Sequence, residues 1–108
     1  MENKYFFYEC EIKSENIEEA RKEIKEIVNK YNGYFSIDFS FLRNNNYIFN
    51  ITLNTNYEKK NEFEKELKET KNTEQITINK MIYFKNQEEY EKFLLGNLNK
   101  IQKTLKTF

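Results

Sequence analysis

The sequence has no histidine, no proline, one cysteine and only two glycines among its 108 residues. Histidine is the commonest general base and metal ligand, so its absence excludes Ser-His and Cys-His nucleophile pairs. A single cysteine permits no internal disulfide and, without histidine, none of the usual zinc sites. The two glycines, Gly33 and Gly96, lie far apart in the sequence, so the chain has no Gly-rich phosphate loop. We therefore expect a protein that is not an enzyme and has no cofactor.

The sequence also lacks an excess of positive or of negative residues. Eighteen basic and 18 acidic residues give a formal net charge of zero, so no overall field attracts nucleic acid or a membrane. The first residues lack the pattern of a signal peptide, and no apolar run reaches transmembrane length. The single Cys10 is typical of a reducing compartment. We expect a soluble, cytoplasmic protein that does not bind membranes.

Aromatic residues are abundant, with ten Phe and eight Tyr. Disordered chains are poor in aromatics, so this content indicates a folded protein. A length of 108 residues fits one domain with one core. We expect a single domain over 1–108, divided into a core over 1–85 and a C-terminal helix over 86–108.

Two hydrophobic patterns alternate along the chain. Aromatic-rich or alternating segments predict strands, and apolar residues at helical spacing predict helices. Asparagine or threonine followed by glutamate three residues later predicts each helix start, at Asn16, Thr55 and Asn86. Asn32-Gly33 is a helix stop, because glycine tolerates the left-handed conformation. The predicted strands are 4–12, 34–42, 47–53 and 74–84, and the predicted helices are 17–31, 57–71 and 87 to near the C-terminus.

The resulting order is β-α-β-β-α-β-α, an α+β fold. Its first six elements resemble the split β-α-β, or ferredoxin-like, arrangement. That arrangement implies an antiparallel sheet of order 4-1-3-2 with two helices on one face.

The last helix carries an apolar stripe at Leu94, Leu98, Ile101, Leu105 and Phe108. We expect this C-terminal amphipathic helix to cover the open sheet face; alternatives are docking on another chain or a basic tail that touches a membrane.

Alternation within the strands predicts which side chains line the open face. Tyr5 and Phe7 should lie near Met81 and Tyr83, which makes one end of the face aromatic. RNA-recognition domains stack bases on such residues. However, the third strand, "NYIFNITL", has no glycine and no positive charge. RNA binding is therefore an alternative function, with candidate residues Tyr5, Phe7, Tyr83, Lys100 and Lys103.

The other end of the open face should carry Glu9, Glu11 and Asp38. Converging carboxylates can hold Mg²⁺, and the small nucleases of CRISPR adaptation share this element order. Their aspartate after the first strand is replaced in "FFYECEI" by Glu9. Ligand-sensing domains of the ACT type share this topology, but they have a glycine-containing loop after the first strand. The segment that follows the first predicted strand here, "KSENIE", contains no glycine. We expect solvated surface acids and no metal, with a metal site as the alternative.

The function that we expect is a non-catalytic, small protein-binding module. Small proteins of this kind from AT-rich genomes include phage or mobile-element inhibitors of a host enzyme, such as a defence nuclease. Interfaces favour aromatic residues, and an acidic patch can mimic nucleic acid or dock on a basic groove. The third possibility is a homodimer joined through the last helix. The expected partner-binding residues are Glu9, Glu11, Glu15, Glu18, Glu19, Leu98, Ile101 and Leu105.

Overall fold

Four strands and three helices follow one another in the predicted order. The computed structural model describes residues 4–43, 46–71, 73 and 75–106, with side chains described for 4–35, 46–71, 73 and 75–96. The predicted boundaries agree with the structure to within about three residues. The elements are β1 (Lys4–Lys13), α1 (Ile17–Lys30), β2 (Gly33–Arg43), β3 (Asn46–Thr55), α2 (Tyr57–Lys68), β4 (Gln75–Phe84) and α3 (Gln87–Lys106).

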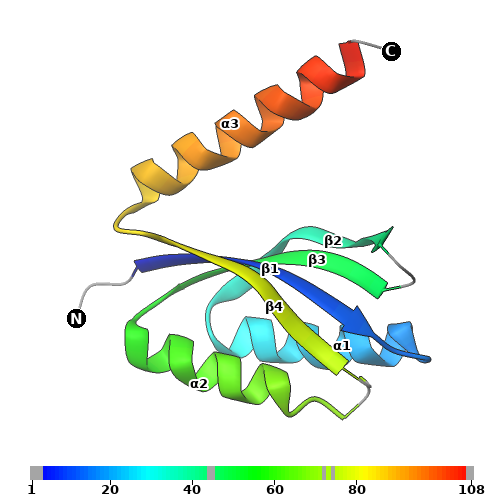
Figure 1. Ribbon diagram of the computed structural model, residues 1–108. Coiled ribbons are helices and arrows are strands. Elements are labelled where there is room, and N and C mark those ends of the chain that lie inside the picture. The colour runs from blue at the N-terminus through cyan, green and yellow to red at the C-terminus, as the bar shows by residue number, and fades with distance from the viewer. Residues whose placement is uncertain (1–3, 44–45, 72, 74, 107–108) are drawn as a thin grey trace.

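The strands form one antiparallel sheet of order β2-β3-β1-β4, which confirms the predicted order. The central strand β1 pairs with β3 on one side and β4 on the other. Helices α1 and α2 cover one face of this sheet, and α3 lies on the opposite side (Figure 1). The element order is consistent with the ferredoxin-like arrangement, in a single α+β domain.

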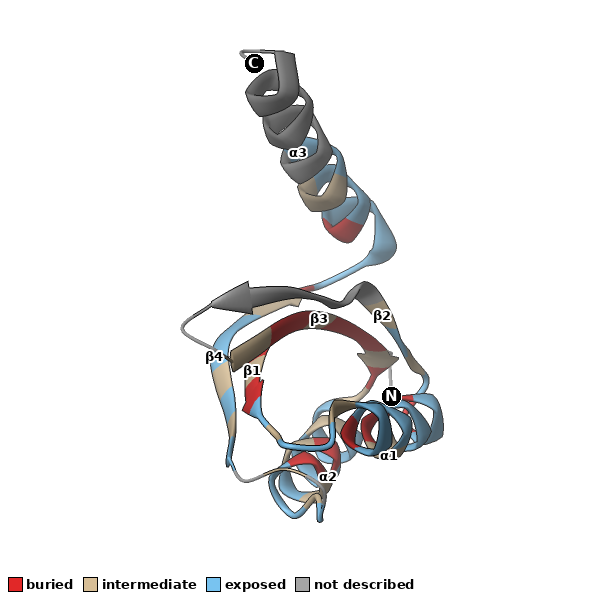
Figure 2. Ribbon diagram, turned by 90° about the vertical axis from the view of Figure 1, so that its right-hand side faces the viewer, coloured by how far each residue is buried: buried red, intermediate tan, exposed pale blue. Residues whose placement is uncertain are grey.

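The main core fills the layer between the sheet and the α1–α2 pair (Figure 2). Alternate residues of the two central strands point into it, because successive side chains of a strand face opposite ways. The thin apolar face of α2 contributes only two buried residues, as predicted. The fully buried core side chains are Phe6, Tyr8, Cys10, Ile12, Ala20, Ile24, Phe49, Ile51, Leu53, Phe63 and Leu67.

Cys10 is completely buried, as its position in the strand pattern predicts. Burial, together with the negative charges of Glu9 and Glu64, raises the pKa of the Cys10 thiol from 9.0 to about 12. The reactive thiolate is therefore scarce at neutral pH. Cys10 acts as a small core residue.

We expect the free energy of unfolding to fall as pH rises above 9, because the Cys10 thiol ionises readily only in the unfolded chain. The stabilisation is complete below the unfolded pKa and is lost as pH approaches the folded value. One such group contributes a slope of about 1.4 kcal/mol per pH unit. Urea unfolding at pH 8, 9 and 10 should show a shallower decline for Cys10→Ala. Equal slopes in the two proteins would contradict this prediction.

Helix starts are fixed by asparagine side chains. Asn16 Oδ1 accepts a hydrogen bond from the backbone N–H of Glu19 at 3.3 Å, and Asn86 Oδ1 accepts one from Glu89 at 3.0 Å. Both starts were predicted. The predicted start at Thr55 is wrong, because Asn56 caps α2 by accepting from the N–H of Lys59 at 2.9 Å. Asparagine is the stronger N-cap of the two neighbours.

The turn from α1 to β2 uses Asn32 and Gly33 differently from the prediction. Asn32, and not Gly33, adopts the left-handed conformation, with φ of 58°. Gly33 is required instead for close packing. A Cβ atom there would lie 2.5 Å from Leu53 Cδ2 and 2.9 Å from the Thr52 carbonyl oxygen.

We expect Gly33→Ala to lower the free energy of unfolding by about 1–3 kcal/mol, because the Thr52 backbone must move away from the new methyl group. Gly96→Ala is the matched control. A Cβ at Gly96, inside α3, meets no described atom within 4 Å, and alanine should stabilise the helix by about 0.5–1 kcal/mol. Urea unfolding of both variants measures the difference. Equal effects of the two substitutions would refute the close-packing role of Gly33.

A β-bulge changes which side chains of β4 face the helices. Glu9 pairs with Lys80 and Cys10 with Ile78, so Asn79 is an extra residue in β4. The prediction that Met81 and Tyr83 line the open face is therefore wrong. Tyr83 packs on the α1–α2 side, against Phe6 and Tyr57, with ring centroids 5.7 and 5.6 Å away. The residues that replace them on the open face are Ile82 and Phe84.

The other edge strand is also irregular. The register between β2 and β3 shifts between Phe35 and Ile37, and again before Phe41. The side chain of Asp38 lies outside the described residues, so its predicted approach to Glu9 and Glu11 is untested. In the described parts of the chain, no helix has the length and apolar character to cross a membrane.

Candidate functional site

The junction between α3 and the open sheet face forms a second apolar cluster. Tyr90 and Phe93, from the first two turns of α3, pack on Phe7 of β1 and Phe84 of β4. The Phe93 ring lies 5.0 Å from Phe7 and 5.1 Å from Phe84. Beyond these turns the axis of α3 runs away from the sheet (Figure 1). The described side-chain contacts of α3 with the sheet therefore lie at one end of the open face.

Tyr90 is the residue that joins α3 to all four strands of the sheet. Its side chain is only 2% exposed, and its ring lies 5.2 Å from Tyr5 and 5.6 Å from Phe84. Its hydroxyl accepts a hydrogen bond from the Tyr34 hydroxyl at 3.0 Å and lies 2.6 Å from Thr52 Oγ1. Burial is the main cause that raises the pKa of Tyr90. The hydroxyl therefore stays protonated and holds β2, β3 and α3 together.

A half-open depression lies beside Tyr90, and we call it the tyrosine pocket. Its volume is about 400 Å³. Tyr5, Tyr34 and Tyr90 bring aromatic rings from β1, β2 and α3. Among the described residues that line it, Glu91 alone is charged. These residues are Tyr5, Asn32, Gly33, Tyr34, Asn54, Gln87, Tyr90, Glu91 and Leu94.

The polar groups of the tyrosine pocket are held by the strand register. Tyr5 pairs with Asn54 across β1 and β3, and Asn54 Nδ2 donates to the Tyr5 hydroxyl at 3.5 Å. Asn54 also exchanges hydrogen bonds with Asn32: its N–H donates to Asn32 O, and its carbonyl accepts from Asn32 Nδ2. Among the described residues, the buried Asn54 Oδ1 finds no hydrogen-bond partner. Buried polar atoms without a partner are uncommon in folded proteins, and a bound water or ligand group is one explanation for them.

The far end of the open face is polar. Glu11 accepts hydrogen bonds from Asn46 Nδ2 at 2.7 Å and Asn79 Nδ2 at 3.1 Å, so it links β1 to both neighbouring strands. Glu9 lies two residues earlier on the same face and is half-buried. These two members of the predicted acidic patch are therefore brought together.

The other acidic residues of that patch lie elsewhere. Glu15 is in the connection after β1, and Glu18 and Glu19 are in the first turn of α1. All three are exposed, and α1 covers the face opposite to Glu9 and Glu11. The sheet thus separates the predicted patch into two groups. Acids in a first turn are favourable because they face the positive end of the helix dipole.

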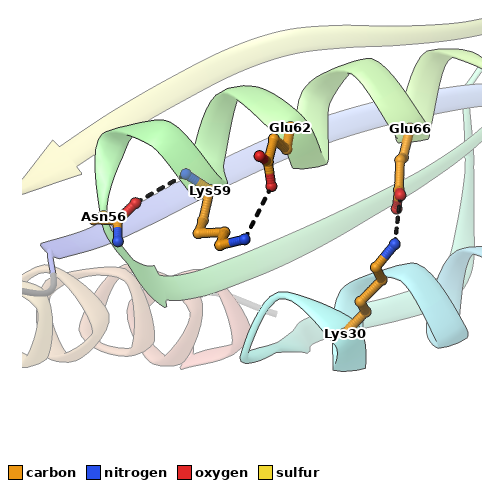
Figure 3. A network of polar contacts seen from close by, with 5 residues as sticks. All are labelled: Lys30, Asn56, Lys59, Glu62 and Glu66. Atoms are coloured by element: carbon orange, nitrogen blue, oxygen red, sulfur yellow. Dashed lines mark hydrogen bonds and ion pairs between the residues drawn. The ribbon is translucent and has the colours of Figure 1, made fainter.

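Charged residues also line the groove between α1 and α2 (Figure 3). Lys30 Nζ lies 2.6 Å from Glu66 Oε1, and this hydrogen bond lowers the pKa of Glu66. Lys59 pairs with Glu62 at 3.3 Å within α2. Opposite charges in this groove therefore neutralise one another, and exposed pairs of this kind stabilise a fold only slightly.

The three aromatic residues predicted for RNA binding do not form one platform. Phe7 is only 6% exposed because Phe93 covers it, and Tyr83 is on the opposite face. Tyr5 lines the tyrosine pocket. The side chains of Lys100 and Lys103 lie outside the described residues, as do those of the predicted partner-binding residues Leu98, Ile101 and Leu105.

A metal site needs several donor side chains within reach of one ion. In the described ranges, no three His, Cys, Asp or Glu side chains lie close enough to share an ion. A comparison with protein-family models and with curated proteins found no match to this chain. The function must therefore be inferred from the surfaces described above.

Two residues of the tyrosine pocket were predicted from the sequence, Tyr5 on the open face and Leu94 in the apolar stripe of the last helix. Tyr90 and Asn54 were not predicted. Tyr90 lies four residues before Leu94, so it extends the apolar stripe of α3 toward the helix start. That spacing is a signal that could have identified it. No sequence pattern marks Asn54, because its role depends on pairing with Tyr5 across two strands.

Proposed function

We propose that the chain is a protein-binding module that presents α3 and the adjoining open face of its sheet to a partner protein. The observation that carries this proposal is the attachment of α3, whose described side-chain contacts with the sheet come from Tyr90, Phe93 and Leu94. The helix then continues to Lys106, and 20 residues at 1.5 Å each extend about 30 Å. Much of its length therefore lies beyond these contacts.

A helix of this kind favours a partner on physical grounds. Isolated helices are marginal in water, and most helical stability in proteins comes from packing an apolar face. The sequence continues the apolar stripe of α3 through Leu98, Ile101 and Leu105, beyond the turns that pack on the sheet. Amphipathic helices that dock in an apolar groove are a common mode of protein recognition. The inhibitor role expected from the sequence stays a prediction within this proposal.

Burial favours a protein partner over RNA. Base stacking needs exposed rings, yet Phe7 is covered by Phe93 and Tyr83 packs against α2 residue Tyr57. Glu9 and Glu11 on the same sheet face repel phosphate. Among the described side chains of this face, the exposed aromatic residue is Tyr34, at 48%.

The test is capture of partners from a native lysate by the immobilised chain, with and without nuclease, read by mass spectrometry. We expect one stoichiometric protein that survives nuclease treatment. It should be lost with the double variant Leu98→Gln/Ile101→Gln, because glutamine keeps helix propensity but removes the apolar surface. Leu95→Gln is the matched control, since Leu95 lies on α3 outside the stripe and is 60% exposed.

Two outcomes would overturn the proposal. Loss of all captured material after nuclease treatment would point to RNA binding. A dimeric molar mass in light scattering, reduced to the monomer by the double variant and accompanied by no captured protein, would assign α3 to a homodimer. Circular dichroism of each variant checks that the fold is intact.

A further inference from the structure

We propose that the tyrosine pocket receives an arginine side chain of the partner protein. This inference rests on the proposed function and specifies the chemistry of the partner surface. The pocket adjoins the α3 contacts, because Tyr90 and Leu94 belong both to its lining and to the cluster that holds α3 on the sheet. A partner docked along α3 therefore reaches it.

The charge of the pocket favours a cation. Lysine and arginine make up 18 of 108 residues, yet the described lining contains neither and contains one carboxylate, Glu91. Gln87 Nε2 donates to Glu91 Oε1 at 2.8 Å, which holds one carboxylate oxygen on the helix surface. The second oxygen retains its capacity to accept from a ligand. The hydroxyl oxygens of Tyr5 and Tyr34 add further acceptors.

The rings select arginine over lysine. Cations bind over aromatic faces. The planar guanidinium of arginine stacks on a ring and also donates two parallel hydrogen bonds to a carboxylate. Tyr34 is half exposed and Tyr5 is half-buried in the lining, so their rings offer surface to a ligand. The buried Tyr90 ring supports Tyr5 from behind, inclined to it by 53°. Lysine carries a compact ammonium that cannot stack in this way.

The orphaned amide oxygen of Asn54 fits the same ligand. In the described part of the chain it is a buried acceptor without a donor, beside the Tyr5 hydroxyl. A guanidinium carries five N–H donors and no acceptor. Its donors can satisfy such a site directly after a small side-chain shift, or through a bridging water.

The experiment titrates the full chain with acetyl-Gly-Arg-Gly-amide and follows backbone amide NMR signals. The neutral control is the same peptide with citrulline in place of arginine, and AMP is the probe for base stacking. We expect saturable shifts of Gly33 and Leu94 with the arginine peptide alone. Glu91→Gln should weaken binding about two- to fivefold, and Tyr34→Leu by a similar factor. Glu88→Gln, an exposed acid on the same helix paired with Lys92, should change nothing.

Several outcomes would overturn the inference: no shift with the arginine peptide, equal shifts with citrulline, insensitivity to Glu91→Gln, or stronger shifts with AMP. These outcomes leave the proposed function intact if α3 still captures a protein. Conversely, arginine binding in the pocket without any captured partner would contradict the proposed function alone. The experiments can therefore contradict either proposal without contradicting the other.

Discussion

Replacement of Tyr90 by alanine should release α3 from the sheet and lower the free energy of unfolding by about 3 kcal/mol or more. Truncation of a buried aromatic side chain removes its packing and leaves a cavity. Tyr90 is 2% exposed and contacts Tyr5 and Phe84 by its ring, and Tyr34 and Thr52 by its hydroxyl. Urea unfolding measures the total loss. Hydrogen exchange should show faster exchange in α3 than in β1, because the helix opens first.

Tyr90→Phe separates the contribution of ring packing from that of the hydroxyl hydrogen bonds. It keeps the ring contacts and removes the hydrogen bonds to Tyr34 and Thr52, so we expect a loss of about 1–2 kcal/mol. Leu95→Ala, at an exposed position of the same helix, should change the free energy of unfolding by less than about 0.5 kcal/mol. If Tyr90→Ala left the exchange of α3 unchanged, Tyr90 would not be what holds the helix.

Replacement of Phe63 by alanine should lower the free energy of unfolding by about 3–5 kcal/mol. Phe63 is fully buried, with its ring 5.4 Å from Tyr8 and 5.9 Å from Tyr31. The buried face of α2 consists of Phe63 and Leu67, so few other contacts compensate for its loss. The loss in free energy of unfolding should therefore lie near the upper end of this range. Urea unfolding gives the value.

The neighbouring Glu62 provides the control for Phe63. Glu62 is exposed and pairs only with Lys59 of the same helix among its described ion pairs. Glu62→Ala should change the free energy of unfolding by less than about 0.5 kcal/mol. A loss below about 1 kcal/mol for Phe63→Ala would mean that α2 rests on the sheet through other contacts.

The strand pattern predicted most of the fold because alternation in the two central strands is strong. Every second residue is apolar and fully buried under α1 and α2, as a covered sheet face requires. These residues are Phe6, Tyr8, Cys10 and Ile12 in β1, and Phe49, Ile51 and Leu53 in β3. Helices α1 and α3 were located from asparagine caps whose hydrogen bonds the structure contains. Local chemistry of this kind is readable because it depends on residues only three apart.

The sequence could not show which face β4 presents. Residues Met81 to Phe84 are all apolar, so no alternation assigns them to a face. The bulge at Asn79 decides the assignment, and it places Tyr83 under the helices. The tyrosine pocket escaped prediction for a related reason. It depends on the angle at which α3 leaves β4, which brings Tyr90 over Thr52 and Tyr34.

The irregular edge strands have a consequence for how this sheet meets other proteins. The outer strands β2 and β4 each carry a register shift, and Lys80 is exposed beside the β4 bulge. Bulges and lysines at an edge prevent another chain from adding a strand, which protects the protein against aggregation. Partners that bind by extending a sheet are therefore disfavoured. This agrees with the proposal that a partner is recognised by side chains of α3 and the adjoining face rather than by an added strand.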